Sequence, residues 1–590
     1  MKKNIIALIS LFAFSLTIMP VGLRAETSDK SASPAIRVTP PAPKFTDAER
    51  QGELARRRAE VARKMAANSL LILRSAEPRN YAGDVDFYYR QENNLYYLTN
   101  LRQNNATLVI AKSGGEGASV QEYLFLPKRN PQFETWNGRM YSREDATRIS
   151  GLKTIIDATE AQAFMQALKD KKTFAAKDGA SIATNVETVY FLLPNGEKDG
   201  IGIAEFRRES EFAKGLTGYK VENARPIFDE LRHVKSPYEI KLMQHAIDIT
   251  TEAHMRSMAM VGKAKWEYEV QAEVEYTFRR RNADYWGYPS IVGCGPNATT
   301  LHYVESQGEI KQSDLLLMDV GAEYDHYTAD VTRTFPVDGK FSKEQAEIYR
   351  IVYDAQEAAA RATKPGTTMS AASKAADDVI KNGLAKLGLI TAPDATFQAT
   401  FNGQTINVPQ YKIWYMHGLG HWLGMNVHDV GSYQTPFKPG MIFTNEPGIY
   451  LREDALDYLA DTPANKEFAA KVRPVFERYK NIGVRIEDDL LVTETGAEWM
   501  TKNLPRKLEE VEAFMARASG EVSYNRASET GINPTLATFD YGFSAENQSG
   551  FWGSFAVPSS GKTVRRGWIW AGKETTVSGL SHASDHSHGD

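Results

Sequence analysis

Residues 315–337 have the sequence LLLMDVGAEYDHYTADVTRTFPV, which predicts two neighbouring strands that each present a carboxylate. Leu315 to Met318 form a continuous apolar run of the kind found in a buried strand, and the run ends at Asp319. In the second stretch, alternate side chains share one face: Asp330, Thr332 and Thr334. The polar residues from Gly321 to His326 indicate a hairpin connection. Such a hairpin places Asp319 beside Asp330, where two like charges cannot both stay ionised without a cation.

Four other segments supply residues of the same chemical type. MHGLGHWLGMNVHDVG carries His417, His421 and His428, TNEPGIY carries Glu446, GVRIEDDLLV carries Arg485 and Glu487, and IVGCGPNATTLHYVES carries His302. The glycines around His421 weaken any helix there and favour a loop that allows close approach of the backbone. A single histidine, or a glutamate in a strand, usually has only a structural or solvated role. The combination is less easily explained in that way.

Two aspartates, two glutamates and one histidine form a set of hard oxygen ligands with one imidazole. Such a set suits Mn²⁺ and accepts Co²⁺, Fe²⁺ or Zn²⁺, whereas a structural zinc site commonly uses thiolates. Because five ligands can include bridging carboxylates, the set predicts two divalent cations about 3.5 Å apart that share a water. We therefore expect a hydrolytic site.

The composition indicates a large globular protein. With 590 residues, of which 42% are hydrophobic and 11% aromatic, the chain can bury large cores and should form at least two domains. Its 74 acidic and 70 basic residues leave a net charge of -4, which gives no electrostatic reason to expect nucleic acid as a partner. Cys294 is the only cysteine, so no internal disulfide can form.

The N-terminus has the layout of a secretory signal peptide. Lys2 and Lys3 precede an apolar run from Ile5 to Met19, and Ala25 follows as a small residue at which cleavage is expected. We expect a signal peptide over residues 1–25, with an uncleaved anchor as the alternative. Because no cysteine lies near the cleavage point, lipoprotein anchoring is not expected. The mature protein should be periplasmic or secreted, without stable insertion in the membrane.

Residues 26–44 are rich in Ser, Pro and Ala and are expected to form a linker. Residues 45–224 alternate between strand and helix patterns and predict an α/β domain. The second domain, residues 225–518, opens at Ser236, which begins an S-x-x-E capping box followed by an apolar helical pattern. Three further helices are expected, from Lys343 to Ala362, Ser370 to Leu387 and Glu509 to Ala518. Residues 519–590 form a polar tail to which no role is assigned.

The order of D-x10-D, HGLGHWLG, EPG and RIED resembles the pita-bread metallopeptidases, in particular the aminopeptidase P and prolidase branch. The resemblance covers roughly residues 49–518 and implies a smaller N-terminal α/β domain followed by a C-terminal pita-bread catalytic domain, a mixture of α/β and α+β architecture. It places five residues on the metal ligands: Asp319, Asp330, His421, Glu446 and Glu487. Asp330 and Glu487 match the bridging carboxylates, and two divalent ions are implied, with Mn²⁺ as the first choice.

The same resemblance implies roles for other residues. His302 and His428 match histidines that face the substrate, and three residues match supporting positions around the site: His417, Arg485 and Tyr288. An amide before proline has no N–H, and its nitrogen leaves poorly unless it receives a proton. The family mechanism implies that an activated water attacks the carbonyl, Glu446 relays the proton, and the substrate-facing histidines stabilise the oxyanion.

The leading hypothesis is an aminopeptidase that releases the first residue from peptides with proline second. The alternatives are a prolidase restricted to dipeptides and a metal-free binding protein of the same fold. Two segments that are long for the family, residues 394–411 and 454–481, could form a lid or wall beside the site. Trp136 is expected on an exposed turn, where it packs against its own domain or, as the resemblance suggests, narrows the substrate entrance of a neighbouring subunit in a homo-oligomer.

Overall fold

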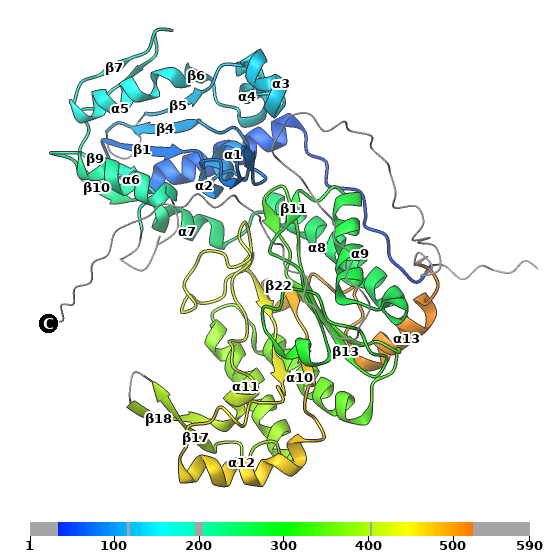
Figure 1. The fold of residues 1–590 in the computed structure, drawn as a ribbon. Helices are drawn as coiled ribbons and strands as arrows, with labels where there is room; N and C mark the ends of the chain where they lie inside the picture. The colour runs from blue at the N-terminus through cyan, green and yellow to red at the C-terminus, as the bar shows by residue number, and fades with distance from the viewer. Residues whose placement is uncertain (1–33, 115–118, 195–203, 402–403, 523–590) are drawn as a thin grey trace, which may run out of the picture. The chain divides into compact units, whose positions relative to one another are not determined.

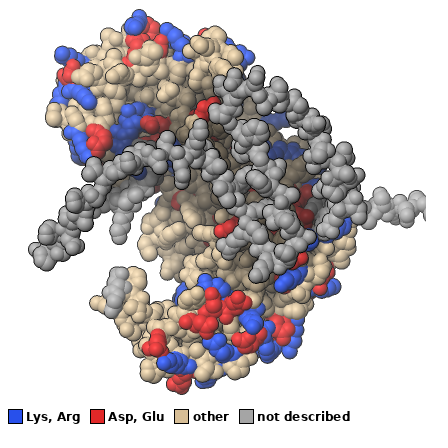
Figure 2. Space-filling view, in the orientation of Figure 1, with Lys and Arg blue, Asp and Glu red and all other residues tan. Residues whose placement is uncertain are grey.

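The computed structural model describes residues 34–114, 119–194, 204–401 and 404–522 (Figure 1). The expected signal peptide, the first part of the linker and the tail from residue 523 lie outside the described residues. Within the described part, no helix combines the length and apolar character needed to cross a bilayer. On the face shown in Figure 2, acidic and basic side chains are intermixed over the coloured surface.

The N-terminal part is built on a six-stranded sheet of order β10-β9-β1-β4-β5-β6 (Figure 1). Its strands are β1 Ser69–Arg74, β4 Thr107–Lys112, β5 Val120–Leu126, β6 Thr154–Asp157, β9 Thr188–Phe191 and β10 Lys220–Asn223. The pairs β1–β4 and β4–β5 are antiparallel, and the other pairs are parallel. In β1, Leu71 and Leu73 face the core shared with α1 and α2, while Leu70 and Ile72 face the core shared with α5. Burial on both faces explains the continuous apolar run from Leu70 to Leu73.

Helices and short strands complete this part, which confirms the expected α/β class. They are α1 Asp47–Lys64, α2 Asn93–Thr99, α3 Pro131–Asn137, α4 Arg143–Ser150, η1 Ala158–Glu160, α5 Ala161–Lys169, α6 Ala204–Lys214, α7 Arg225–His233, β2 Asn80–Ala82, β3 Val85–Asp86, β7 Phe174–Ala175 and β8 Ser181–Ile182. The first helix begins after Thr46, whose hydroxyl forms a capping box with Glu49.

The described residues of the expected linker are not free of the fold. The amide of Ala35 donates to Glu521, and the amide of Thr39 donates to Glu252 across 2.7 Å. Ile36 is buried in the core formed with α8 and α13. Among the described residues, the expected linker therefore contacts the fold from Ala35 onward, because the apolar side chain of Ile36 packs into a core that composition alone does not reveal.

The C-terminal part contains the predicted carboxylate strands. They are β13 Leu315–Val320 and β16 Val331–Pro336, which pair antiparallel with each other, while β12 Ile291–Cys294 pairs with β13. Leu316 and Met318 face the core formed with α8 and α9, so Asp319 points from the opposite face. The connection is more ordered than expected, because β14 Ala322–Tyr324 and β15 Tyr327–Thr328 form a second hairpin whose turn residues, Asp325 and His326, are left-handed.

Three further groups of strands lie around this pair. In the first group, β11 Tyr285–Trp286 pairs with β14. The second is a sheet of β19 Ile442–Asn445, β22 Asp488–Val492 and β23 Ala497–Trp499. In the third, β20 Gly448–Tyr450 pairs with β21 Gly483–Arg485. A single bridge between Thr332 and Glu487 joins β16 to the segment between β21 and β22. This bridge brings two strands far apart in the sequence to one site.

Helices cover both sides of these strands. They are α8 Pro237–Met260, η2 Val261–Lys263, α9 Glu267–Arg280, η3 Gly295–Thr299, α10 Lys343–Ala362, α11 Met369–Leu387, η4 Gln410–Ile413, α12 Pro463–Phe476 and α13 Leu508–Ala518. The predicted capping box of Ser236 and Glu239 opens α8, as expected. One core lies between the strands and α8, α9 and α13, and another involves α10, α11 and α12. Between them the polar faces of the strands form the site.

The two long segments expected to flank the site pack against each other instead. The first forms a hairpin of β17 Thr396–Phe401 and β18 Gln404–Pro409, beside α12 of the second (Figure 1). Asn465 of α12 accepts from the amide of Gln398 at 2.9 Å and donates to its carbonyl at 2.8 Å. Among the described residues, neither segment lines the cavity that contains Asp319 and Asp330, so the expected lid or wall is not formed by them here.

Candidate metal centre

A cavity of about 810 Å³ lies in the C-terminal part and collects the predicted site residues of that part. The predicted residues that line it are Tyr288, His302, Asp319, Asp330, His417, His421, His428, Glu446, Arg485 and Glu487. Apolar side chains, including Leu301, Val427 and Leu419, form much of the remaining wall. The cavity is therefore a polar cluster within an apolar pocket, as expected of a small-molecule or peptide site.

The two aspartates of the strand pair meet at the hydroxyl of Tyr288. This hydroxyl lies 2.6 Å from Oδ1 of Asp319 and 2.5 Å from Oδ1 of Asp330. Because a phenol has a single proton, it can donate to only one carboxylate at a time. Burial and the adjacent Asp319 raise the pKa of Tyr288 well above its usual value, so the hydroxyl remains a donor.

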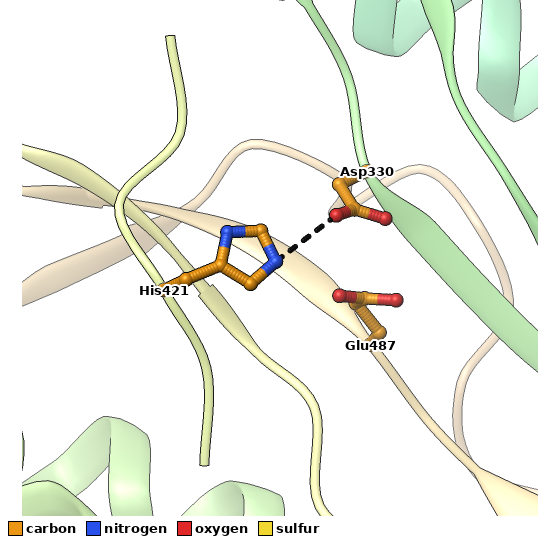
Figure 3. Close-up of side chains that lie close together, drawn as sticks. All are labelled: Asp330, His421 and Glu487. Carbon is orange, nitrogen blue, oxygen red and sulfur yellow. Dashed lines mark ion pairs between the residues drawn. The ribbon is translucent and has the colours of Figure 1, made fainter. Parts of the chain in front are cut away.

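His421 faces the carboxylates from a loop, as the glycines around it predicted. Its Nε2 atom lies 3.2 Å from Oδ2 of Asp330 (Figure 3). The same nitrogen lies 3.5 Å from Oε1 of Glu446. On the other side of the ring, Nδ1 lies 3.1 Å from the carbonyl of Trp422. Despite burial, the hydrogen bond to Asp330 raises the pKa of His421 to about 9, so without a cation the ring is protonated and Nε2 donates to that carboxylate. A cation that replaced this proton would leave Nδ1–H donating to the Trp422 carbonyl and the Nε2 lone pair free to act as a ligand. A metal-ligating histidine is oriented in this way.

Threonine hydroxyls orient the two glutamates. The hydroxyl of Thr332 donates to Oε2 of Glu487 at 2.6 Å, and the hydroxyl of Thr444 donates to Oε1 of Glu446 at 3.2 Å. Glu487 points towards Asp330 and His421 from the bridge that joins the strands (Figure 3). Each glutamate keeps an oxygen that the threonine does not use, so it remains available as a ligand.

The electrostatics of the cavity favour a bound cation. Burial, together with the nearby carboxylates, raises the pKa of Glu446 to about 7 and raises the pKa of Glu487 well above its usual value. Burial also raises the pKa of Asp319, although Arg485 opposes this effect. Four carboxylates are thus held together at a cost that a divalent cation would remove.

The donor atoms fit such a cation. Ligand atoms of Asp330, His421 and Glu487 all lie within 4.8 Å of one another. Asp319 is linked to this group through Tyr288, and Glu446 lies beside His421. Oxygen donors with one imidazole and no sulfur match the preferences of Mn²⁺ and similar divalent ions.

Arg485 links the carboxylates of the cavity to Tyr450 and His417. Its guanidinium donates to Asp319 at 2.6 Å, to the hydroxyl of Tyr450 at 2.9 Å and to the hydroxyl of Thr332 at 3.1 Å. The same Tyr450 hydroxyl lies 2.8 Å from Nε2 of His417. Burial and the positive charge of Arg485 lower the pKa of His417 to about 3, so its imidazole is neutral near pH 7.

Tyr450 and Thr332 were not among the predicted site residues. Tyr450 lies in the same TNEPGIY segment as Glu446, but Glu446 falls between β19 and β20, so strand alternation does not relate the two residues. Thr332 shares the predicted face of Asp330 and contacts Glu487 directly. Strand alternation was therefore an available signal for Thr332 but not for Tyr450.

The two histidines predicted to face the substrate lie at the wall of the cavity. The ring of His428 packs against that of His421, with centroids 4.2 Å apart. Burial and the neighbouring His421 lower the pKa of His428, which favours its neutral form. His302 lines the cavity and is exposed to it. Both imidazoles are therefore available to a ligand in the cavity.

Trp136 lies outside this cavity. It belongs to the short helix α3 rather than to the expected turn, because Asn130 caps the helix and Pro131 occupies its first position. Its side chain is 84% exposed, so packing against its own domain is also not observed. An indole this exposed is available to a partner.

The fold and the site together define a metal-dependent hydrolase with an N-terminal α/β domain and a pita-bread catalytic domain. Residues 241–494 match metallopeptidase family M24, and residues 54–175 match the N-terminal domain of aminopeptidase P. The Xaa-Pro aminopeptidase of Haemophilus influenzae is 35% identical over 78% of this chain and 97% of its own length. The Xaa-Pro aminopeptidase of Escherichia coli is 32% identical over 79% of this chain and 98% of its own length.

Solved structures agree with these similarities. Aminopeptidase P from E. coli with the inhibitor Pro-Leu superimposes with a TM-score of 0.64 and 31% identity, covering 79% of this chain and 98% of that structure. A structure described as a putative aminopeptidase P from Bacillus anthracis gives a TM-score of 0.67 at 28% identity, covering 80% of this chain and all of that structure. The chain belongs to the Xaa-Pro aminopeptidases of metallopeptidase family M24.

Proposed function

We propose that this protein hydrolyses the first peptide bond of peptides whose second residue is proline. The observation that carries the proposal is that one cavity collects four carboxylates and His421 in an arrangement suited to divalent cations. The names of the relatives support the Xaa-Pro aminopeptidase activity over the prolidase alternative. A metal-free binding protein would have no need to hold these mutually repelling carboxylates together.

We infer two cations at this site, with Mn²⁺ as the preferred ion. Asp330 and Glu487 would hold both ions, Asp319 would complete one ligand set, and His421 and Glu446 would complete the other. When bound, the ions would supply Lewis-acid polarisation of the scissile carbonyl and of the attacking water. Proton transfer, stabilisation of the carbonyl oxygen and binding of the substrate amine depend on side chains that the structure describes.

Glu446 is the residue placed to move the proton. Its carboxylate lies beside His421 in the cavity, where it can accept a proton from water and later donate it to the leaving proline nitrogen. His428 and His302 lie at the cavity wall, where they can donate to the carbonyl oxygen as negative charge develops on it. Arg485 fixes Asp319, near which the free amine of the substrate would bind.

Two peptides test this proposal and separate its alternatives. Mn²⁺-loaded protein is incubated with Ala-Pro and with Ala-Pro-Ala, and the released alanine is quantified by chromatography. An aminopeptidase cleaves the tripeptide well, whereas a prolidase cleaves only the dipeptide. If both peptides remain intact, the proposed function is refuted.

We further propose export to the periplasm or the medium and assembly into a homo-oligomer. The charged and apolar pattern of residues 1–25 supports export. The exposed Trp136 supports an oligomer in which this side chain reaches a neighbouring subunit. Cell fractionation with N-terminal sequencing of the purified protein tests the first proposal, with cleavage after Ala25 expected.

A further inference from the structure

The loop of residues 424–431 carries His428 and is held from the side opposite the cavity. Val427 and His428 line the cavity. The neighbouring backbone is fixed by residues distant in sequence, since the amide of Thr328 donates to the carbonyl of Gly424 at 3.0 Å and the guanidinium of Arg90 donates to that of Met425 at 2.6 Å. The loop is therefore positioned by contacts outside the catalytic cavity.

Asp429, which directly follows His428, turns away from the cavity into a buried cluster of charges. Its side chain is 1% exposed, and Oδ1 accepts from Arg232 at 2.6 Å. The ammonium group of Lys235, which is also 1% exposed, lies 3.6 Å from Oδ2. Both cations come from the connection formed by α7 and the residues before α8. A buried carboxylate depends on such partners, because water cannot solvate its charge.

The loop is shaped to admit this carboxylate. A Cβ atom at Gly424 would lie 2.0 Å from Oδ2 of Asp429, so any other residue there would displace the carboxylate or the loop. The amide of Asp429 donates to the carbonyl of Trp422 at 2.8 Å, which closes the loop immediately after His421. The position of Asp429 thereby determines where the preceding His428 can lie.

The N-terminal domain joins the same cluster. Besides Asp429, Arg232 donates to Oδ1 of Asn94 at 2.9 Å, and Asn94 belongs to α2. Asn93, the preceding residue, donates to the side chain of Asn426 at 2.7 Å. With the contact from Arg90, residues 90–94 of the N-terminal domain touch the loop directly or through Arg232.

We propose that Arg232 and Asp429 are positioning residues for His428, and that the N-terminal domain sets the substrate-facing loop through them and through Asn93. The inference rests on the proposed function, because it assigns His428 to substrate. If the ion pair served stability alone, breaking it would lower the melting temperature without a specific effect on substrate binding.

Two variants test the proposal. Asp429→Asn removes the charge with little change in shape, and Asn93→Ala removes the contact with Asn426 without burying a charge. We expect KM for Ala-Pro-Ala to rise about tenfold in the first and about threefold in the second, because small displacements of a binding group weaken substrate positioning. The dissociation constant of Pro-Leu, measured calorimetrically, should rise in parallel while metal content remains that of the parent.

Arg74→Met provides the matched control, since it breaks the partly buried pair of Arg74 with Glu209 within the N-terminal domain. It should lower the melting temperature and leave KM and the Pro-Leu affinity unchanged. Parental KM and Pro-Leu affinity in Asn93→Ala and in folded Asp429→Asn would overturn the proposal. If the parent itself cleaves no Xaa-Pro peptide, the proposed function fails instead, which is a separate result.

Discussion

Arg485 donates to Oδ2 of Asp319 across 2.6 Å, although the two residues belong to strands far apart in the sequence. The contact fixes the carboxylate at the end of β13 and leaves its other oxygen facing Tyr288. The same guanidinium reaches Thr332, which in turn holds Glu487. Two carboxylates of the proposed metal centre are therefore oriented by one buried cation.

Replacement of a carboxylate at the centre of the site should abolish metal binding. Asp330→Ala and Glu487→Ala should each reduce turnover by at least about a thousandfold, because the remaining carboxylates no longer complete either ligand set. Metal content is measured by inductively coupled plasma mass spectrometry after dialysis. Glu498→Ala, at a half-exposed surface position, is the control and should retain both metals. Two metals retained in either cavity variant would contradict the proposed bridging role.

Glu446 should contribute a pH-dependent term to the stability of the metal-free protein. Burial raises its pKa from 4.5 to about 7, so the folded state binds more protons than the unfolded state between these values. This contribution to stability is complete below about pH 4.5 and is lost as the pH rises to about 7, by at most about 3 kcal/mol.

The measurement is the difference between two pH profiles of the unfolding free energy, obtained for the metal-free parent and for Glu446→Gln. Taking the difference removes the opposing contribution of buried histidines such as His417, whose pKa is lowered to about 3. The parent should lose stability relative to the variant as the pH rises from 4.5 to 7. Parallel profiles would show that Glu446 titrates normally. In the metal-loaded enzyme, the same variant should lower turnover by about a hundredfold or more while some metal remains bound.

Much of this architecture could be predicted from sequence because its signals are local. The apolar run before Asp319, the alternation after Asp330 and the capping box at Ser236 each report the period or the end of one element. By contrast, the core that buries Ile36 and the contact between Asn465 and Gln398 depend on surfaces brought together only by the fold. No local pattern predicts those contacts.

The site likewise combines residues that local sequence patterns predict with residues that only the fold brings together. Residues of the metal centre stand out because carboxylates are costly next to apolar strands. Tyr450 does not stand out, since a tyrosine in a strand is ordinary, and only the folded structure brings its hydroxyl to Arg485 and His417. Trp136 was expected on a turn, but Asn130 as the cap and Pro131 at the first position begin a short helix that includes it.

His302 should affect chemistry more than metal binding. His302→Ala should lower turnover by about a hundredfold, the effect expected when a donor to the developing oxyanion is removed, with metal content unchanged. Steady-state kinetics and metal analysis on the same preparation provide the test. Loss of metal in this variant would identify His302 as a ligand instead.

Trp136 should act between subunits. Trp136→Ala should leave the melting temperature and metal content unchanged, because 84% of its side chain is exposed in the single chain. We expect a higher KM or a smaller assembly by light scattering, since the indole would lose its partner surface. Phe133→Ala, on the same helix and 40% exposed, tests whether the effect is specific to the indole. An active monomer with a kinetically silent Trp136→Ala would refute the role.

The central claim is that this site cleaves the bond before proline and that its carboxylates must hold a divalent cation for it to do so. The most direct measurement follows alanine release from Ala-Pro-Ala and Ala-Ala-Ala by protein that has been stripped with a chelator and then titrated with Mn²⁺. We predict no release without metal, restoration as about two equivalents bind, and a preference for the proline peptide of at least about a hundredfold. Equal cleavage of the two peptides, or full activity in the stripped protein, would contradict this account.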